Sequence, residues 1–196
     1  DRIFFERQKK AVDEYDVRRW KKLLKHFRGG RLIDLGCLDS LVPLFAKEKY
    51  PNALYWGIDL AEKAIREMGE LYPFVDYEVR SVYQTDFPSE FFDYAVAGEL
   101  IQHLGEPDKF LFEAFRILKP GGVLAISVPL EEAREPGAVD GQRHIYSFDK
   151  KDMQDLLAPY CEKIKTDIAG SLFSVKPPFY RYCWPSLIAF CKKYES

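Results

Sequence analysis

The sequence predicts an α/β fold: a doubly wound, Rossmann-like sheet of seven mostly parallel strands, with helices on both faces and the last strand antiparallel. Short apolar segments alternate with segments whose apolar residues recur every three or four positions, which is typical of a parallel sheet covered by helices. Gly36 follows the first apolar segment, and Asp59 ends the second. The motif LKPGG at 118–122 lies between a predicted helix and a predicted strand.

The elements follow in order along the chain. Helical periodicity over 5–27 stops at Gly29 and Gly30, as expected of a left-handed helix cap. We then expect strands at 31–35, 53–59, 75–79, 92–97 and 122–128, with helices at 41–48, 61–72 and 108–118 between them. Pro120 and Gly121 should break the last of these helices from the strand that follows.

The pattern changes after residue 129. Residues 131–141 are charged and without periodicity, which indicates an exposed loop. A helix over 150–157, capped by Ser147 or Asp149, precedes strands at 163–168 and 187–191. The segment 171–185 between these strands is aromatic and rich in proline.

The bulk composition is typical of one soluble globular domain. The chain has 196 residues, 47% of them hydrophobic and 31% charged, with a net charge of −2. We predict a single domain over 1–196, with an N-terminal helical lid (1–30), a cofactor-binding core (31–130) and a substrate-side loop with C-terminal strands (131–196). The longest apolar runs, of about ten residues, are too short to span a bilayer. We expect no membrane insertion and, without a secretory pattern at the N-terminus, a cytoplasmic location.

Cysteine spacing and charge distribution give two further expectations. The four cysteines are scattered without C-x2-C spacing, so we expect core thiols rather than a zinc site or a disulfide framework. The first 31 residues carry eleven Lys/Arg against five Asp/Glu. This basic segment is either the solvated side of an amphipathic helix or a surface that contacts phosphate.

Two candidate ligand-binding positions follow the first two strands. In a doubly wound sheet, ligands bind beyond the carboxyl ends of the strands. Gly36 permits close approach or an unusual φ, and Asp34 can accept hydrogen bonds that fix the turn. Asp59 lies where a carboxylate can accept both ribose hydroxyls of an adenosyl ligand; its alternative role is a helix N-cap. A nicotinamide cofactor would require G-x-G-x-x-G, whereas this turn has glycine only once.

Residues 92–104 (FDYAVAGELIQHL), the helix after them and the LKPGG motif at 118–122 together resemble the class I S-adenosylmethionine (SAM)-dependent methyltransferases. Within that class they resemble most the small bacterial enzymes of the ubiquinone-biosynthesis type. The resemblance covers 15–128 well and the remainder loosely. It implies that the cofactor is SAM and that a methyl group is transferred to an oxygen or nitrogen atom of a small-molecule acceptor, such as a sugar, a lipid-linked intermediate or a metabolite.

The same resemblance implies a set of cofactor-binding residues. The methionine end would lie against Gly36 and Cys37, with Asp34 and Leu38 as further cofactor-binding residues of the same turn. The ribose would lie at Asp59 with Leu60 beside the adenine, and the adenine at Ser81 and Val82. The sulfonium would lie at Gly98 and Glu99, and Tyr15 would form a lid. Two departures stand out: Leu38 and Ser40 replace glycines, and Ser81 replaces the family's usual carboxylate. Leu38 fits if its φ is negative and its side chain points at the sheet.

Methyl transfer needs alignment more than acid or base chemistry, because a base is required only if the nucleophile carries a proton. Glu99, His103 and His144 are the candidate catalytic residues. His103 follows Glu99 by four residues, which would place both on one face of a helix; its alternative is a histidine bonded to nearby backbone. A divalent metal on these three would need a carboxylate where Gln102 stands, so no metal ligand is assigned.

Three functions stay open at this stage. A small-molecule methyltransferase would build its acceptor pocket from Tyr15, His103, His144, Tyr146 and the aromatic run 173–184, unless that run packs in the core. An RNA methyltransferase would require the basic N-terminal face to lie beside the pocket. A catalytically inactive SAM-binding partner subunit is the third. A monomer or a homodimer is expected in each case.

Overall fold

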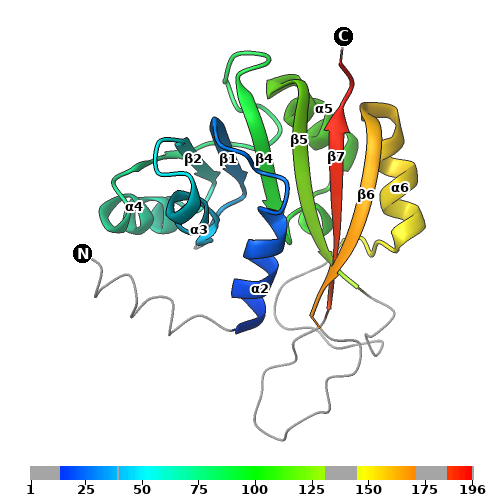
Figure 1. Ribbon diagram of the computed structural model, residues 1–196, viewed down its shortest axis with the longest axis horizontal. Coiled ribbons are helices and arrows are strands. Elements are labelled where there is room, and N and C mark those ends of the chain that lie inside the picture. The colour runs from blue at the N-terminus through cyan, green and yellow to red at the C-terminus, as the bar shows by residue number, and fades with distance from the viewer. Residues whose placement is uncertain (1–13, 39, 131–144, 171–184, 196) are drawn as a thin grey trace, which may run out of the picture.

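The computed structural model describes residues 14–38, 40–130, 145–170 and 185–195 (Figure 1). In chain order, its elements are α2 (Glu14–Leu23), β1 (Arg31–Leu35), α3 (Val42–Lys49), β2 (Leu54–Asp59), α4 (Glu62–Leu71), β3 (Val75–Val79), β4 (Phe92–Gly98), the 3-10 turn η1 (Ile101–His103), α5 (Pro107–Ile117), β5 (Leu118–Pro129), α6 (Lys150–Leu157), the 3-10 turn η3 (Ala158–Tyr160), β6 (Cys161–Ala169) and β7 (Ser186–Lys193).

The strands form one seven-stranded sheet in the order β3-β2-β1-β4-β5-β7-β6. The first five of these are parallel, and β7 runs antiparallel to both of its neighbours. The predicted fold class is confirmed. Chain order reverses between β1 and β4, and such a switch point is where doubly wound sheets bind their ligands.

Helices cover both faces of the sheet because inward-facing residues alternate along each strand. In β1, Ile33 and Leu35 belong to the core under α5 and α6, whereas Leu32 belongs to the core under α2, α3 and α4. α2 is anchored by Trp20, Leu23 and Phe27, which are all buried. Asp34 shares the face of Leu32, so its carboxyl points toward α2.

The predicted break between α5 and β5 is wrong, because β5 begins at Leu118, ahead of the proline and glycines. Phe92 pairs with Leu118 and Tyr94 with Val123, so two steps along β4 match five along β5 and the motif bulges out of the ladder. A bulge tolerates proline because no ladder hydrogen bond is required there.

Asp93 ties three strands together at the amino-terminal edge of the sheet. Its Oδ2 accepts a hydrogen bond from the Arg31 backbone N–H at 2.8 Å, and its Oδ1 lies 2.6 Å from Lys119 Nζ. Gly30 has a φ of +90°, and a Cβ there would lie 2.4 Å from Asp93 Oδ2. The clamp therefore requires a residue without a side chain at position 30.

The helix predicted at 150–157 is confirmed with Asp149 as its cap. The Asp149 side chain accepts from the Asp152 backbone N–H, and the Asp152 side chain accepts from Asp149 in return. In the part of the chain that the structure describes, no helix is both long and apolar enough to cross a membrane.

The expectation of unpaired thiols is wrong for two of the four cysteines. Cys161 and Cys191 form a disulfide between β6 and β7, with Cα atoms 5.5 Å apart. Cys37 is buried and is not part of a disulfide. The pairing depends on β6 and β7 being neighbours, which cysteine spacing does not reveal.

Replacing Gly30 with alanine should lower the free energy of unfolding by at least about 2 kcal/mol, because the new Cβ meets Asp93 in a backbone conformation that alanine avoids. Gly69→Ala in α4 is the matched control: no atom lies within 4 Å of its added Cβ, and alanine favours the helix by up to about 1 kcal/mol. Urea denaturation measures both. Equal stability of the two variants would contradict the Asp93 clamp.

Candidate active site

A close contact at the carboxyl edge joins the turn after β1 to the end of β4. Gly36 has a φ of +68°, and a Cβ there would lie 2.6 Å from Leu100 Cδ1. The backbone N–H groups of Gly36 and Cys37 both donate to the carbonyl of Ile58, at 2.8 and 3.0 Å. The turn is thus held between β2 and β4. Cys37 is only 2% exposed, and its carbonyl accepts from the Ser40 backbone N–H at 2.6 Å, so this residue supports the turn from beneath.

Asp59 fixes the same turn from the end of β2. Its Oδ2 accepts from the Leu38 backbone N–H at 3.0 Å, and its Oδ1 accepts from that of Ala61 at 2.9 Å. The expectation for Leu38 is wrong: its φ is +40° and its side chain is 45% exposed. The hydrogen bond from the Leu38 backbone N–H to Asp59 explains this conformation. Leu60, which follows Asp59, is 70% exposed.

Asp34 is a buried carboxyl beneath this edge, only 2% exposed. Burial raises the pKa of the Asp34 carboxyl to about 7, against the smaller opposing effects of a hydrogen bond from Ser40 and the charge of Arg19. Its Oδ2 has no hydrogen-bond partner among the described residues. An unpaired buried oxygen of this kind is costly, and a ligand donor would satisfy it.

Glu99 connects β4 to three other elements. Its φ is +53°, and its backbone N–H donates to the carbonyl and Oγ of Ser127 in β5, at 3.0 and 3.1 Å. Its Oε1 accepts from Ser186 Oγ in β7 at 2.6 Å and lies 3.2 Å from the Arg19 guanidinium. Arg19 also pairs with Asp16 at 2.6 Å, so α2 is joined to the edge through this guanidinium.

Sequence reasoning missed Arg19, treating it as part of a basic surface. A signal was present, because Arg19 lies four residues before the buried Leu23 and therefore on the inward side of α2, unlike the exposed Lys21. Its side chain is 11% exposed. Its distant partner, Glu99, could not be read from local spacing.

His103 does not share a helical face with Glu99, so that expectation is wrong. Glu99 lies in the left-handed region, outside the short turn η1 that ends at His103. The buried Gln102 lies beside it, with its Nε2 at 3.4 Å from His103 Nε2. The Gln102 carbonyl accepts from the backbone N–H groups of Ile145 and Tyr146, at 2.8 and 3.2 Å. The backbone of Tyr146 thus lies beside that of Gln102, the neighbour of His103 in the chain, and the acceptor pocket itself stays a prediction.

The remaining predicted residues are placed as follows. Ser81 Oγ accepts from the Tyr83 backbone N–H at 3.2 Å and shapes the turn after β3, where Val82 is buried. A Cβ at Gly98 would make only ordinary contacts, 3.6 Å from Leu23. His144, the run 173–184 and the Tyr15 side chain lie outside the described residues.

Two other features of the described residues bear on the site. No group of three or more His, Cys, Asp or Glu among them is arranged to hold a metal ion. A hollow of about 320 Å³ lies at the opposite, amino-terminal edge, lined by residues such as Gly30, Tyr50 and Ala53. We place the site at the carboxyl edge because the unpaired Asp34 oxygen and the carboxylates gather there.

Comparison with known proteins agrees with this geometry. Residues 33–126 match the family described as a methyltransferase domain. A probable SAM-dependent methyltransferase of Mycolicibacterium smegmatis is 32% identical over 131 residues, covering 65% of this chain and 50% of its own. A ubiquinone biosynthesis O-methyltransferase of Thiobacillus denitrificans is 31% identical over 110 residues, covering 53% and 46%. The chain spans about half the length of these curated relatives.

Solved structures show the same fold at low identity. A Burkholderia thailandensis 1,6-didemethyltoxoflavin N1-methyltransferase, with its substrate and S-adenosylhomocysteine bound, superposes with a TM-score of 0.74 at 18% identity, covering 97% of this chain and 83% of its own. The [4+2]-cyclase SpnF superposes with a TM-score of 0.72 at 19% identity, covering 91% and 82%. Since the fold also occurs in a cyclase, fold alone does not assign a reaction.

The raised pKa of Asp34 predicts a pH-dependent stability. The folded chain binds this proton more tightly than the unfolded chain, whose pKa is near 3.8, so the free energy of unfolding should fall between about pH 4 and pH 7. The full loss is up to about 4 kcal/mol. Asp34→Asn cannot ionise, so its stability relative to wild type should rise across this window in urea denaturation. A difference that does not change with pH would contradict the prediction.

Arg19→Gln should destabilise the fold by about 3 kcal/mol, because it removes the counter-charge of partly buried Asp16 and Glu99. Arg18→Gln, at the exposed neighbouring position, should stay within about 0.5 kcal/mol of wild type. Thermal and urea unfolding measure both variants. Similar losses in the two would show that Arg19 contributes no more than a surface charge.

Proposed function

We propose that this chain, which belongs to the class I SAM-dependent methyltransferases, transfers a methyl group from SAM to an oxygen or nitrogen atom of a small-molecule acceptor. One observation carries the proposal: Asp34, Gly36, Asp59 and Glu99 meet at the carboxyl edge of β2, β1 and β4, at the switch point of the sheet. Four residues spread over 66 positions thereby form one polar edge.

The residues at this edge suit the parts of SAM. Each Asp59 oxygen retains a lone pair beyond its backbone bond, so the carboxylate can accept the two ribose hydroxyls. Leu38 and Leu60 present exposed apolar side chains on either side of Asp59, as a flat adenine ring requires. The unpaired Asp34 oxygen offers an acceptor to the ammonium end, directly or through water, and the Arg19 guanidinium offers a cation to the carboxylate end.

SAM, when bound, supplies a methyl group on a positively charged sulfur. The contribution of this chain is alignment, together with acceptance of a proton where the acceptor carries one. Ser127 holds the backbone of Glu99, and Ser186 and Arg19 hold its carboxylate, so the carboxylate is fixed in one position. His103 is the second candidate base, and its ring lies beside Gln102.

The small-molecule acceptor is inferred from two sources. The ubiquinone-biosynthesis and toxoflavin enzymes are named for methylation at oxygen and at nitrogen, respectively, of small molecules. Tyr146 is 40% exposed and its hydroxyl donates to the Gly105 carbonyl at 3.4 Å, two residues after His103, so its ring offers a flat surface for an aromatic ring or a sugar.

Calorimetry with SAM and with S-adenosylhomocysteine tests cofactor binding. Asp59→Ala should weaken SAM binding about 10- to 100-fold, because two charge-assisted hydrogen bonds are lost. Asp76→Asn, at an exposed position in β3, should bind like wild type. Circular dichroism confirms that both variants fold. Absence of binding by wild type would contradict the proposal.

Release of S-adenosylhomocysteine with a panel of phenols, amines and sugars tests turnover. Wild type should methylate at least one of them, and Glu99→Gln and His103→Asn should lower kcat while leaving the Kd for SAM within a few-fold. SAM binding without turnover on any acceptor would instead identify a catalytically inactive subunit.

A further inference from the structure

The solvent-facing side of α2 carries a row of cations. Arg18, Lys21, Lys25 and Arg28 follow one another at three- and four-residue spacing, and all four are exposed. Arg18 and Lys21 lie in α2, where residues at this spacing are about 5–6 Å apart on one side of the helix. Lys25 and Arg28 lie in the turn after α2, where the Arg28 guanidinium donates to the carbonyls of Lys25 and Phe27 at 2.9 and 2.7 Å. These four residues are called the α2 row below.

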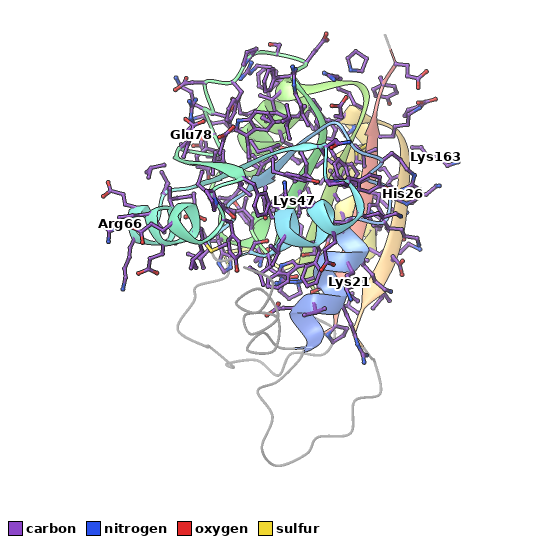
Figure 2. The ribbon with its side chains drawn as sticks, turned by 60° about the vertical axis from the view of Figure 1, so that its left-hand side comes forward. Lys21, His26, Lys47, Arg66, Glu78 and Lys163 are labelled. Atoms are coloured by element: carbon purple, nitrogen blue, oxygen red, sulfur yellow. A yellow bond between two sulfur atoms is a disulfide. The ribbon has the colours of Figure 1, made fainter. Side chains whose placement is uncertain are left out.

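Two neighbouring elements extend this positive surface. α3 contributes Lys47 and Lys49 on one side, and β6 contributes Lys163 and Lys165 on the other. Lys165 pairs in register with Phe190, whose ring packs edge-on against His26 at 4.6 Å, so this part of β6 faces the same way as α2. Figure 2 shows Lys21, Lys47, His26 and Lys163 on one side of the molecule.

The basic face is defined by the α2 row, Lys22 and the four lysines of α3 and β6. It holds nine Lys/Arg, whereas α2, α3 and β6 together carry five acidic residues, Glu14, Asp16, Glu48, Glu162 and Asp167. Asp167 pairs with Lys22 and Lys25 at 3.1 and 2.9 Å. A chain with a net charge of −2 thus concentrates positive charge on one side. The local potential also acts on His26, whose pKa is lowered by burial and then by Lys165, Lys25 and Arg28.

The chemistry of the basic face narrows the choice of partner. Lys21, Lys47 and Lys49 lie over the rings of Phe45, Phe74 and Tyr50, at 5.5, 4.5 and 5.4 Å, so these aromatic rings are covered. No described side chain of α2, α3 or β6 is an exposed large hydrophobic one. Peripheral membrane binding normally adds inserted apolar residues, and sequence-tolerant base stacking needs exposed rings. The basic face therefore offers a partner positive charge, without exposed large apolar side chains.

We propose that the basic face binds the phosphodiester backbone of a single-stranded nucleic acid, independently of its sequence. Neighbouring cations along this face can neutralise successive phosphates of a strand, and phosphate neutralisation alone supports sequence-independent binding. The row begins at the candidate active site, where Arg18 adjoins Arg19, and continues away from it along α2. A bound strand would pass beside the site, whatever acceptor the site uses.

Fluorescence anisotropy with a labelled oligouridine tests this proposal on the whole chain. Wild type should bind, and log K should fall with log salt with a slope of about −3, from four neutralised phosphates. The variant with Arg18→Gln, Lys21→Gln, Lys25→Gln and Arg28→Gln should lose at least about 10-fold in affinity at low salt, with a shallower slope. The control carries Lys63→Gln, Arg66→Gln, Lys109→Gln and Lys151→Gln in α4, α5 and α6; it removes the same charge and should bind like wild type.

Four outcomes would overturn the proposal. The first two are the absence of wild-type binding at low salt and an equal loss of affinity in the two variants. The third is binding to phosphatidylserine vesicles but not to RNA. The fourth is a strong preference for RNA over DNA of equal length, which phosphate contacts alone cannot give. Circular dichroism and a thermal melt verify that both variants are folded. Calorimetry with SAM on the same variants should be unchanged, which separates this surface from the proposed methyl transfer.

Discussion

The contact of Gly36 with Leu100 is the constraint on which the carboxyl edge depends. A Cβ at position 36 would lie 2.6 Å from Leu100 Cδ1, so the Leu100 side chain would have to shift, and the φ of +68° would be strained in any residue other than glycine. Glu99, which precedes Leu100, is held to β5 by the hydrogen bond from its backbone N–H to Ser127. Pairing places β1 and β4 side by side. The absence of a Cβ at position 36 determines how closely the segments that follow these two strands approach each other.

Charge balance is the second condition at this edge. Asp34, Asp59 and Glu99 bring three acidic groups toward one another, and burial makes ionisation of Asp34 unfavourable. The counter-charge comes from Arg19 in another layer, held in place by the buried Trp20 and Leu23 on the same helix. The apolar packing of α2 on the sheet thus positions Arg19 beside Glu99 at the end of β4. α2 therefore contributes both to the hydrophobic core and to the charge balance of the site.

Periodicity was sufficient for most of the fold because each strand and helix has its own local pattern. β1, β3 and α6 have the predicted bounds, and the other elements differ mainly at their ends. The start of β5 could not be predicted, because a bulge depends on the register of β4. The left-handed conformation of Leu38 depends on a bond to Asp59, 21 residues away. The candidate site was predictable where family motifs mark it, whereas Arg19 and Ser186 depend on contacts between distant segments.

The placement of β7 has a consequence for how this protein is made. β7 lies between β5 and β6, although it follows both in the chain. While a ribosome is still synthesising the segment before residue 186, β1 to β5 can pair in order, but β5 has an open edge and β6 has no neighbour. The nascent chain therefore exposes an unpaired apolar strand until β7 has been synthesised, which is the condition under which chains aggregate or recruit chaperones. The sheet closes only when β7 enters between two strands that were made before it.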